Sequence, residues 1–256
     1  MSERREFFQV GGRPRIEVRI SSGRIMIEGH DEGGVEVRVD GKNADGFTVE
    51  QYGDGISVRQ SSERGLFGGS HRVSLRVPAD AEVDTSVASA DVDVMCPIGD
   101  LRVSAASGDV KARSIERDFT LKTASGDVDV DHVGGRVQIT TASGDIGIHS
   151  VGRHCTISTA SGDIEIGKVS GDVRLKTASG DVDIARFLGG EIDCKTVSGD
   201  LTLGVPAGRK VEVDLQTMTG SVHLPQDRRE SVDGEGGESV SIRFRSVSGD
   251  VRLDRA

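Results

Sequence analysis

The sequence is poor in aromatic residues, which make up 3% of its 256 residues, with no tryptophan and a single tyrosine, Tyr52. Aromatic side chains normally supply much of a globular core. Here Val, Ile and Leu must fill the interior, which suits a narrow core between stacked strands. Exposed aromatic rings, on which sugars usually stack, are nearly absent as well, which weighs against a carbohydrate-binding platform.

Cysteine and proline are also scarce. There are five prolines and three cysteines, Cys96, Cys155 and Cys194. The odd number and wide spacing of the cysteines give no metal-binding or redox pair. An alignment of the repeats described below places Cys155 and Cys194 where other copies carry Val or Leu. We therefore expect small, buried thiols in a reducing compartment.

Positive charge is in deficit, and the formal net charge is -10. This balance disfavours a nucleic-acid partner and simple electrostatic docking on an anionic membrane. No apolar run is long enough to span a membrane, and the charged start, MSERREFF, is not followed by the apolar stretch of a signal peptide. We expect a cytoplasmic protein with no direct membrane span.

Glycine, in contrast, is abundant, with 35 residues, and much of it belongs to a repeat. The tripeptide Ser-Gly-Asp recurs every 18 residues from Ser107 to Ser179, then 19 residues later at Ser198, and last at Ser248. Degenerate copies at Ser89 and Thr219 make nine in all. Further small, glycine-containing turns lie nine residues after several copies, so each unit holds two turn-plus-strand halves.

Alternating apolar and polar positions predict strands with one inward and one outward face. Val128 and Val130 face inward in one half of their unit. In the other halves, the inward columns are Val137, Ile139 and Thr141; Cys155, Ile157 and Thr159; Val173, Leu175 and Thr177; and Ile192, Cys194 and Thr196. The sequence thus predicts an all-β fold, a β-solenoid of about nine 18-residue coils. A long antiparallel β-meander with a hairpin every nine residues explains the same spacing and is the alternative.

Residues 1–83 lack the repeat but still alternate like strands. Because the ends of a solenoid need covering, we expect this segment to be a β-rich N-terminal cap on a solenoid formed by residues 84–256. The polar, glycine-rich stretch 225–238 is expected to be a loop between the eighth and ninth copies.

The first candidate site is the column of repeated aspartates, one on each coil. Stacked carboxylates repel one another, so a calcium ion or backbone N–H groups in the turns must offset that repulsion. The glycines are not spaced as in the calcium-binding G-G-x-G-x-D repeat, and Arg136 and His154 stand where a second-half Asp would be needed. We therefore predict structural turns without metal or cofactor, and the calcium column is the alternative. Its members are Asp109, Asp127, Asp145, Asp163, Asp181 and Asp200; the structural turn residues are Ser107, Gly108, Ser125, Gly126, Ser143, Gly144, Ser161, Gly162, Ser179, Gly180, Ser198 and Gly199.

A threonine column runs beside the aspartates, and we expect it to face inward, with its hydroxyls hydrogen-bonded along the ladder. Its members are Thr123, Thr141, Thr159, Thr177 and Thr196. The six histidines are scattered, and no nucleophile–base grouping stands out. A catalytic site is normally singular, whereas these motifs recur on every coil, so we predict no enzymatic activity and no catalytic residues.

The string TASGDVDV at Thr123–Val130, with its copies TASGDIGI, TASGDIEI and TASGDVDI, resembles the bacterial DUF4097 family of β-strand-repeat proteins. The opening pattern around Phe8 and Ile16–Ile25 is similar to the start of that family as well. The family carries the label "putative adhesin". The resemblance implies a non-enzymatic role at the surface or in association with the cell envelope.

We predict a non-enzymatic structural or protein-interaction scaffold related to envelope stress. It is expected to bind a protein partner, or a second copy of itself, through the solenoid ends or the polar face. The outward positions carry mixed charge, with Lys122, Arg136, Arg174 and Lys176 on one face and Asp129, Glu165 and Asp183 on the other. The alternatives are a surface or carbohydrate-binding adhesin and a calcium-binding protein of the β-roll type.

Overall fold

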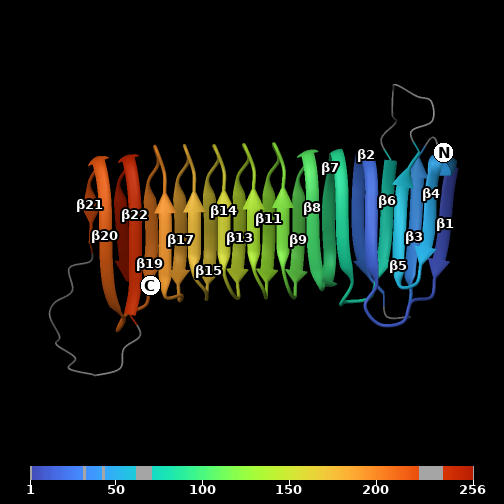
Figure 1. The fold of residues 1–256 in the computed structure, drawn as a ribbon, viewed down its shortest axis with the longest axis horizontal. Helices are drawn as coiled ribbons and strands as arrows, with labels where there is room; N and C mark the ends of the chain where they lie inside the picture. The colour runs from blue at the N-terminus through green and yellow to red at the C-terminus, as the bar shows by residue number, and fades with distance from the viewer. Residues whose placement is uncertain (1, 31–32, 42–43, 62–70, 225–238, 256) are drawn as a thin grey trace. The chain divides into compact units, whose positions relative to one another are not determined.

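The computed structural model describes residues 2–30, 33–41, 44–61, 71–224 and 239–255. These residues form two compact units, Met1–Gly135 and Arg136–Ala256, and each unit is described by itself. Strands account for nearly all of the regular structure in both units, as Figure 1 shows. Among the described residues, no helix has the length and apolar character needed to cross a membrane.

The first unit contains eleven strands and one short 3-10 helix. They are β1 (Ser2–Phe8), β2 (Arg15–Gly29), β3 (Val35–Gly41), η1 (Ala44–Gly46), β4 (Phe47–Tyr52), β5 (Gly55–Gln60), β6 (His71–Val77), β7 (Glu82–Ile98), β8 (Asp100–Ser107), β9 (Val110–Ile115), β10 (Phe119–Lys122) and β11 (Val128–Val133). β2 joins two segments, Arg15–Ile20 and Arg24–Glu28, whose alternation reads as two separate strands in the sequence.

In the first unit, parallel strand pairing already occurs in residues that precede the first Ser-Gly-Asp motif. β2 pairs in parallel with β7 over most of its length, from Arg15 opposite Glu82 to Ile27 opposite Val94. β7 in turn pairs in parallel with β8 and β9. The long strand β7 also spans the expected boundary between residues 83 and 84. The segment before that boundary therefore already contributes a strand, β2, to the stacked ladder.

The cap of this unit adds antiparallel pairs to the parallel ladder. β5 and β6 pair in parallel with β2, whereas β4 with β5, β3 with β6 and β1 with β3 are antiparallel pairs. Phe47 and Ala44 lie at the start of β4 and in η1, and both side chains are fully buried. The cap thus closes the apolar interior at this end of the unit.

The second unit consists of strands alone among its described residues. They are β12 (Val137–Thr140), β13 (Ile146–Val151), β14 (Cys155–Ser158), β15 (Ile164–Val169), β16 (Val173–Lys176), β17 (Val182–Phe187), β18 (Glu191–Lys195), β19 (Leu201–Val205), β20 (Lys210–Thr219), β21 (Val222–His223), β22 (Ser239–Ser248) and β23 (Val251–Arg255). Each strand of a coil pairs in parallel with the equivalent strand of the next coil, for example Cys155 with Val173 and Ile164 with Val182.

This parallel register confirms the solenoid and excludes the antiparallel meander. The predicted faces are also correct, because every apolar residue of the inward columns is buried, and Val128 and Val130 are buried as well. Four phenylalanines complete the interior and are among its largest fully buried side chains, namely Phe47, Phe119, Phe187 and Phe244. Elsewhere the core is chiefly Val, Ile and Leu, as the composition predicts.

The coils of the second unit are not stacked in the order of the sequence. β22 pairs on one side with β18 and on the other with β20, while β23 pairs with β19 and with β21. The last segment of the chain therefore lies between two earlier coils, and β20 and β21 form the outermost coil (Figure 1). The stretch 225–238, predicted to be a loop, lies outside the described residues.

Candidate functional site

The Ser-Gly-Asp turns form a corner of the coils, and their glycines pack backbone against backbone. Gly162 and Gly180 have φ angles of +114° and +131°, a region that L side chains rarely adopt. A Cβ on Gly162 would lie 2.2 Å from the carbonyl oxygen of Gly144. Parallel bridges join the turn serines of successive coils, such as Ser161 with Ser179. Glycine at this corner is therefore required both by the dihedral angle and by the space between coils.

The aspartate column is a chain of hydrogen bonds between coils. The backbone N–H of Asp163 donates to Oδ1 of Asp145 at 2.9 Å, and the N–H groups of Asp181 and Asp200 donate in the same way at 2.8 Å to the aspartate of the preceding coil. In the first unit the same bond joins Asp109 to Asp91 at 3.2 Å and Asp127 to Asp109 at 3.0 Å.

These bonds offset the repulsion within the column, because each amide places a positive dipole on a carboxylate. The donor comes from the next coil and not from the same turn. Among the described residues, no group of three or more His, Cys, Asp or Glu side chains is placed to hold a metal ion.

The threonine column faces inward as expected. Thr141, Thr159, Thr177 and Thr196 are buried, whereas Thr123 is half-buried. The prediction that the threonine hydroxyls hydrogen-bond along the ladder, from coil to coil, is wrong. The hydroxyls of the first three, and of Thr123, donate within their own coil to the carbonyl of the turn serine two residues on, at 2.9–3.1 Å. Within the part of the chain that the structure describes, the buried Thr196 hydroxyl has no hydrogen-bond partner.

The three cysteines are free and buried, which confirms their expected burial. Burial raises the pKa of the Cys155 and Cys194 thiols to about 12 and that of Cys96 to about 11. A thiol with so high a pKa carries almost no thiolate at neutral pH and is a poor nucleophile. These cysteines therefore act as small core residues.

The outer face of β16, β18 and β22 carries positive charges in direct register. Lys176 is opposite Lys195, and Lys195 is opposite Arg245, so three cations lie side by side on adjacent strands. We call these three residues the cationic row. Lys195 has an ion pair with Asp193 at 3.6 Å, while no carboxylate among the described residues pairs with Lys176 or Arg245. Like charges that face each other across strands destabilise a sheet, and the single carboxylate of Asp193 offsets this repulsion only in part.

Beside the cationic row lies an exposed apolar ridge, formed by Val197, Val247 and Met218. Their side chains are 54%, 50% and 81% exposed. The Ser248 N–H donates to the Val197 carbonyl, and the flanking residues of Met218 pair with those of Val247, so the ridge crosses three adjacent coils. The equivalent position of earlier copies is alanine, as in Ala160 and Ala178. This change was visible in the repeat alignment, but the neighbourhood of Val247 and Met218 depends on the unexpected stacking order.

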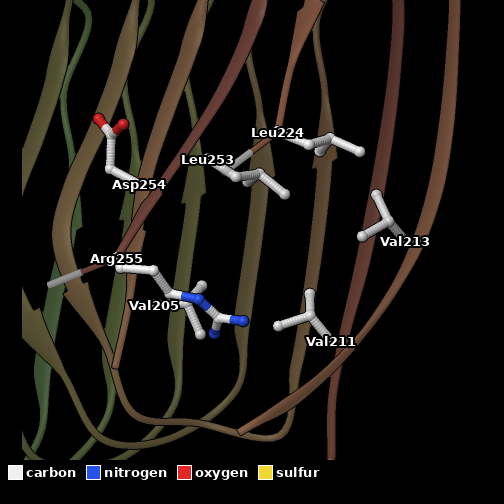
Figure 2. Close-up of a pocket in the computed structure, with 7 residues that line it drawn as sticks. All are labelled: Val205, Val211, Val213, Leu224, Leu253, Asp254 and Arg255. Atoms are coloured by element: carbon white, nitrogen blue, oxygen red, sulfur yellow. The ribbon is translucent and has the colours of Figure 1, made fainter. Parts of the chain in front are cut away.

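The outermost coil of the second unit leaves part of the interior open. A cavity of about 170 Å³ lies there. It is lined by Val205, Val211, Val213, Leu224, Leu253, Asp254 and Arg255. Figure 2 shows valine and leucine side chains gathered from β19, β20 and β23, together with Leu224, which follows β21; the Asp254 carboxylate is directed away from them.

A family model for Toastrack DUF4097 matches residues 14–254, so the chain belongs to this family. One similar solved structure is a "putative adhesin" from Parabacteroides distasonis, with a TM-score of 0.57, 14% identity, and coverage of 98% of this chain and 97% of that one. Another is a "putative adhesin" from Bacteroides fragilis, with a TM-score of 0.51, 11% identity and the same coverage of both chains. No curated protein matches the sequence. At these identities the likeness establishes the fold.

Proposed function

We propose that this protein is a non-enzymatic protein-interaction scaffold, and that the cationic row and the apolar ridge together bind an acidic protein partner. The observation that carries the proposal is the register of Lys176, Lys195 and Arg245 on three adjacent strands. Such a row costs stability in the isolated chain. A partner with carboxylates spaced along an extended segment would neutralise it.

The apolar ridge is a second reason to place the binding site on this surface. Lys195 and Val197 are two residues apart and lie on the same outer side, so charge and apolar surface are adjacent. Binding surfaces commonly combine a small apolar centre with charged groups that set orientation and partner choice. The stacked coils below hold these side chains in a fixed array, as a scaffold requires.

The test is a capture experiment with two charge-reversal variants. Lys176→Glu combined with Lys195→Glu and Arg245→Glu removes the cationic row. The control, Lys168→Glu with Arg186→Glu, reverses two exposed cations that face each other across β15 and β17. Immobilised protein is exposed to extract of the source cells, and bound proteins are identified.

We expect the wild type and the control to retain the same protein partner, with binding that weakens as salt is raised, and the triple variant to lose it. Equal capture by the triple variant and the control would contradict the proposed surface. Recovery of glycans alone would instead favour the adhesin function suggested by the names of the two structural relatives.

A further inference from the structure

β20 presents a free edge. It is ten residues long and pairs with β22 on one side, and among the residues that the structure describes no strand pairs with its other side. Every second residue along that edge therefore directs its backbone N–H and C=O groups away from the unit. A long, unpaired edge strand without proline is a template for another strand.

The side chains of β20 that face the interior are also incompletely covered. Ile192 and Ile242 are buried, but Val213, the next residue in the same column, is 39% exposed. In the neighbouring column Cys194 and Phe244 are fully buried, whereas Leu215 is half-buried. Each inner column is thus closed by the next coil until β20, beyond which the described residues supply no further coil.

In the first unit, β1 pairs only with β3 and β4 only with β5 among the described residues, so these strands have free edges as well. They are shorter than β20, at seven and six residues, and Phe47, which begins β4, and Ala44, in η1, are buried there. The incompletely covered apolar columns are those at β20, and two such ends that cover each other form a two-fold dimer, in which both subunits use the same surface.

We propose that two copies of this chain associate through their β20 edges, antiparallel to each other, with the two-fold axis at Leu215. The β20 edge includes Met218 of the apolar ridge but no residue of the cationic row, so the dimer does not depend on the charge interaction of the proposed function. The pairing extends both ladders and covers the exposed valines of one copy with the inner face of the other.

The position of the axis follows from the charges on β20. In an antiparallel pair, opposite residues point to the same face, so a continuous core requires inward residues to face inward residues. The axis must then pass through a residue and not between two residues. An axis at Glu212 or Asp214 places that carboxylate opposite itself, and an axis at Val213 places Glu212 opposite Asp214.

An axis at Leu215 opposes no like charges. It pairs Val211 with Thr219, Val213 with Thr217, and Asp214 with Gln216, each twice. It also uses almost all of the strand, from Val211 to Thr219. It is therefore the longest register that keeps the core continuous without opposing carboxylates.

The register is tested by cross-linking. Leu215→Cys places two thiols opposite each other at the axis, within reach of an oxidant or a short bifunctional thiol reagent. The matched control, Val213→Cys, faces Thr217 of the second copy and leaves its two thiols several residues apart. The native cysteines are buried and do not interfere. We expect a covalent dimer from Leu215→Cys and none from Val213→Cys.

The association itself is tested by sedimentation of the full chain over a range of concentrations. Gln216 is exposed and faces Asp214 of the second copy, so Gln216→Lys should tighten the dimer and Gln216→Asp should weaken it, each by roughly fivefold in dissociation constant for two equivalent pairs. Both variants should keep the circular dichroism spectrum of the wild type.

A chain that is monomeric at millimolar concentration overturns the proposal. So does a dimer that is insensitive to both Gln216 variants, or one in which Val213→Cys cross-links and Leu215→Cys does not. A monomer that still captures an acidic partner through the cationic row would refute the dimer and leave the proposed function intact.

Discussion

The backbone N–H of Asp181 donates a hydrogen bond of 2.8 Å to the carboxylate of Asp163, which lies one coil earlier in the same column. The carboxylate therefore has a structural partner that the next coil supplies. Neighbouring coils are joined at this corner by a side chain as well as by the backbone ladder.

Replacing Asp163 tests this bond. Asp163→Ala removes the acceptor and should lower the free energy of unfolding by about 1 kcal/mol. Asp163→Asn keeps a carbonyl oxygen in the same place and should lose less than half as much. Urea denaturation gives the stability, and hydrogen exchange of the Asp181 amide should be faster in the alanine variant alone. Equal losses in the two variants would show that the hydrogen bond contributes little.

The turn glycines should tolerate no side chain. Gly162→Ala combines a positive φ angle with a Cβ that would overlap the Gly144 carbonyl, so we expect a loss of about 3 kcal/mol in stability. The control is Gly190→Ala, where a Cβ would meet nothing closer than the Asp172 side chain at 3.5 Å. Thermal denaturation should separate the two variants clearly, and similar melting temperatures would contradict the close packing of the coils.

The buried thiols should give the protein an alkaline stability limit. The pKa of Cys155 is about 12 in the folded chain, above its ordinary value of 9.0, so the unfolded state loses this proton first as the pH rises. The buried, protonated thiol makes its full contribution to the free energy of unfolding below pH 9. That contribution declines between pH 9 and about 12, by up to about 1.4 kcal/mol per pH unit.

Cys155→Val isolates that contribution, since Val137 and Val173 occupy the paired positions of adjacent coils. The variant should keep its stability at pH 7 and lose less of it than the wild type between pH 9 and pH 11, as measured by urea denaturation at each pH. Rapid labelling of Cys155 by a thiol reagent in the native protein would argue against its burial.

Calcium should not stabilise the fold. Each of Asp145, Asp163 and Asp181 gives one carboxylate oxygen to a backbone N–H of the next coil. We therefore expect the melting temperature to be the same in EDTA and in millimolar calcium. A rise of several degrees with calcium would support the alternative in which the aspartate column binds metal.

The repeat predicts the core of this fold because burial and spacing are local properties of the sequence. The constant spacing of the repeat gives the length of a coil, and the alternation of apolar and polar residues shows which side chains face inward. The amino-acid pattern alone therefore assigns Val173, Leu175 and Thr177 to the inward side. Hydrogen-bond partners are harder to predict. The sequence shows that Asp163 is repeated but not whether its carboxylate meets an amide of its own turn or one from the next coil.

The order of the last coils could not be predicted either. Ser198 is followed by two copies, at Thr219 and Ser248, and either of them has the strand pattern needed to pair with it. Nothing in the sequence pattern shows which of the two copies is stacked next to the copy at Ser198. In the structure Ser198 bridges to Ser248, and the N–H of Ser221 then donates to Asp250 at 2.6 Å. The ridge and the free edge of β20 both follow from this choice, so sequence reasoning missed them.

β22 and β23 lie between coils that precede them in the sequence, and this order has a consequence for biosynthesis. A solenoid that is stacked in sequence order can grow from the ribosome one coil at a time, each new coil settling on the last. Here β20 and β21 are synthesised before the coil on which they rest. They must wait, or pair temporarily elsewhere, until β22 and β23 have been synthesised. A ribosome that stalls between β21 and β22 therefore leaves β20 and β21 without the strands on which they pack.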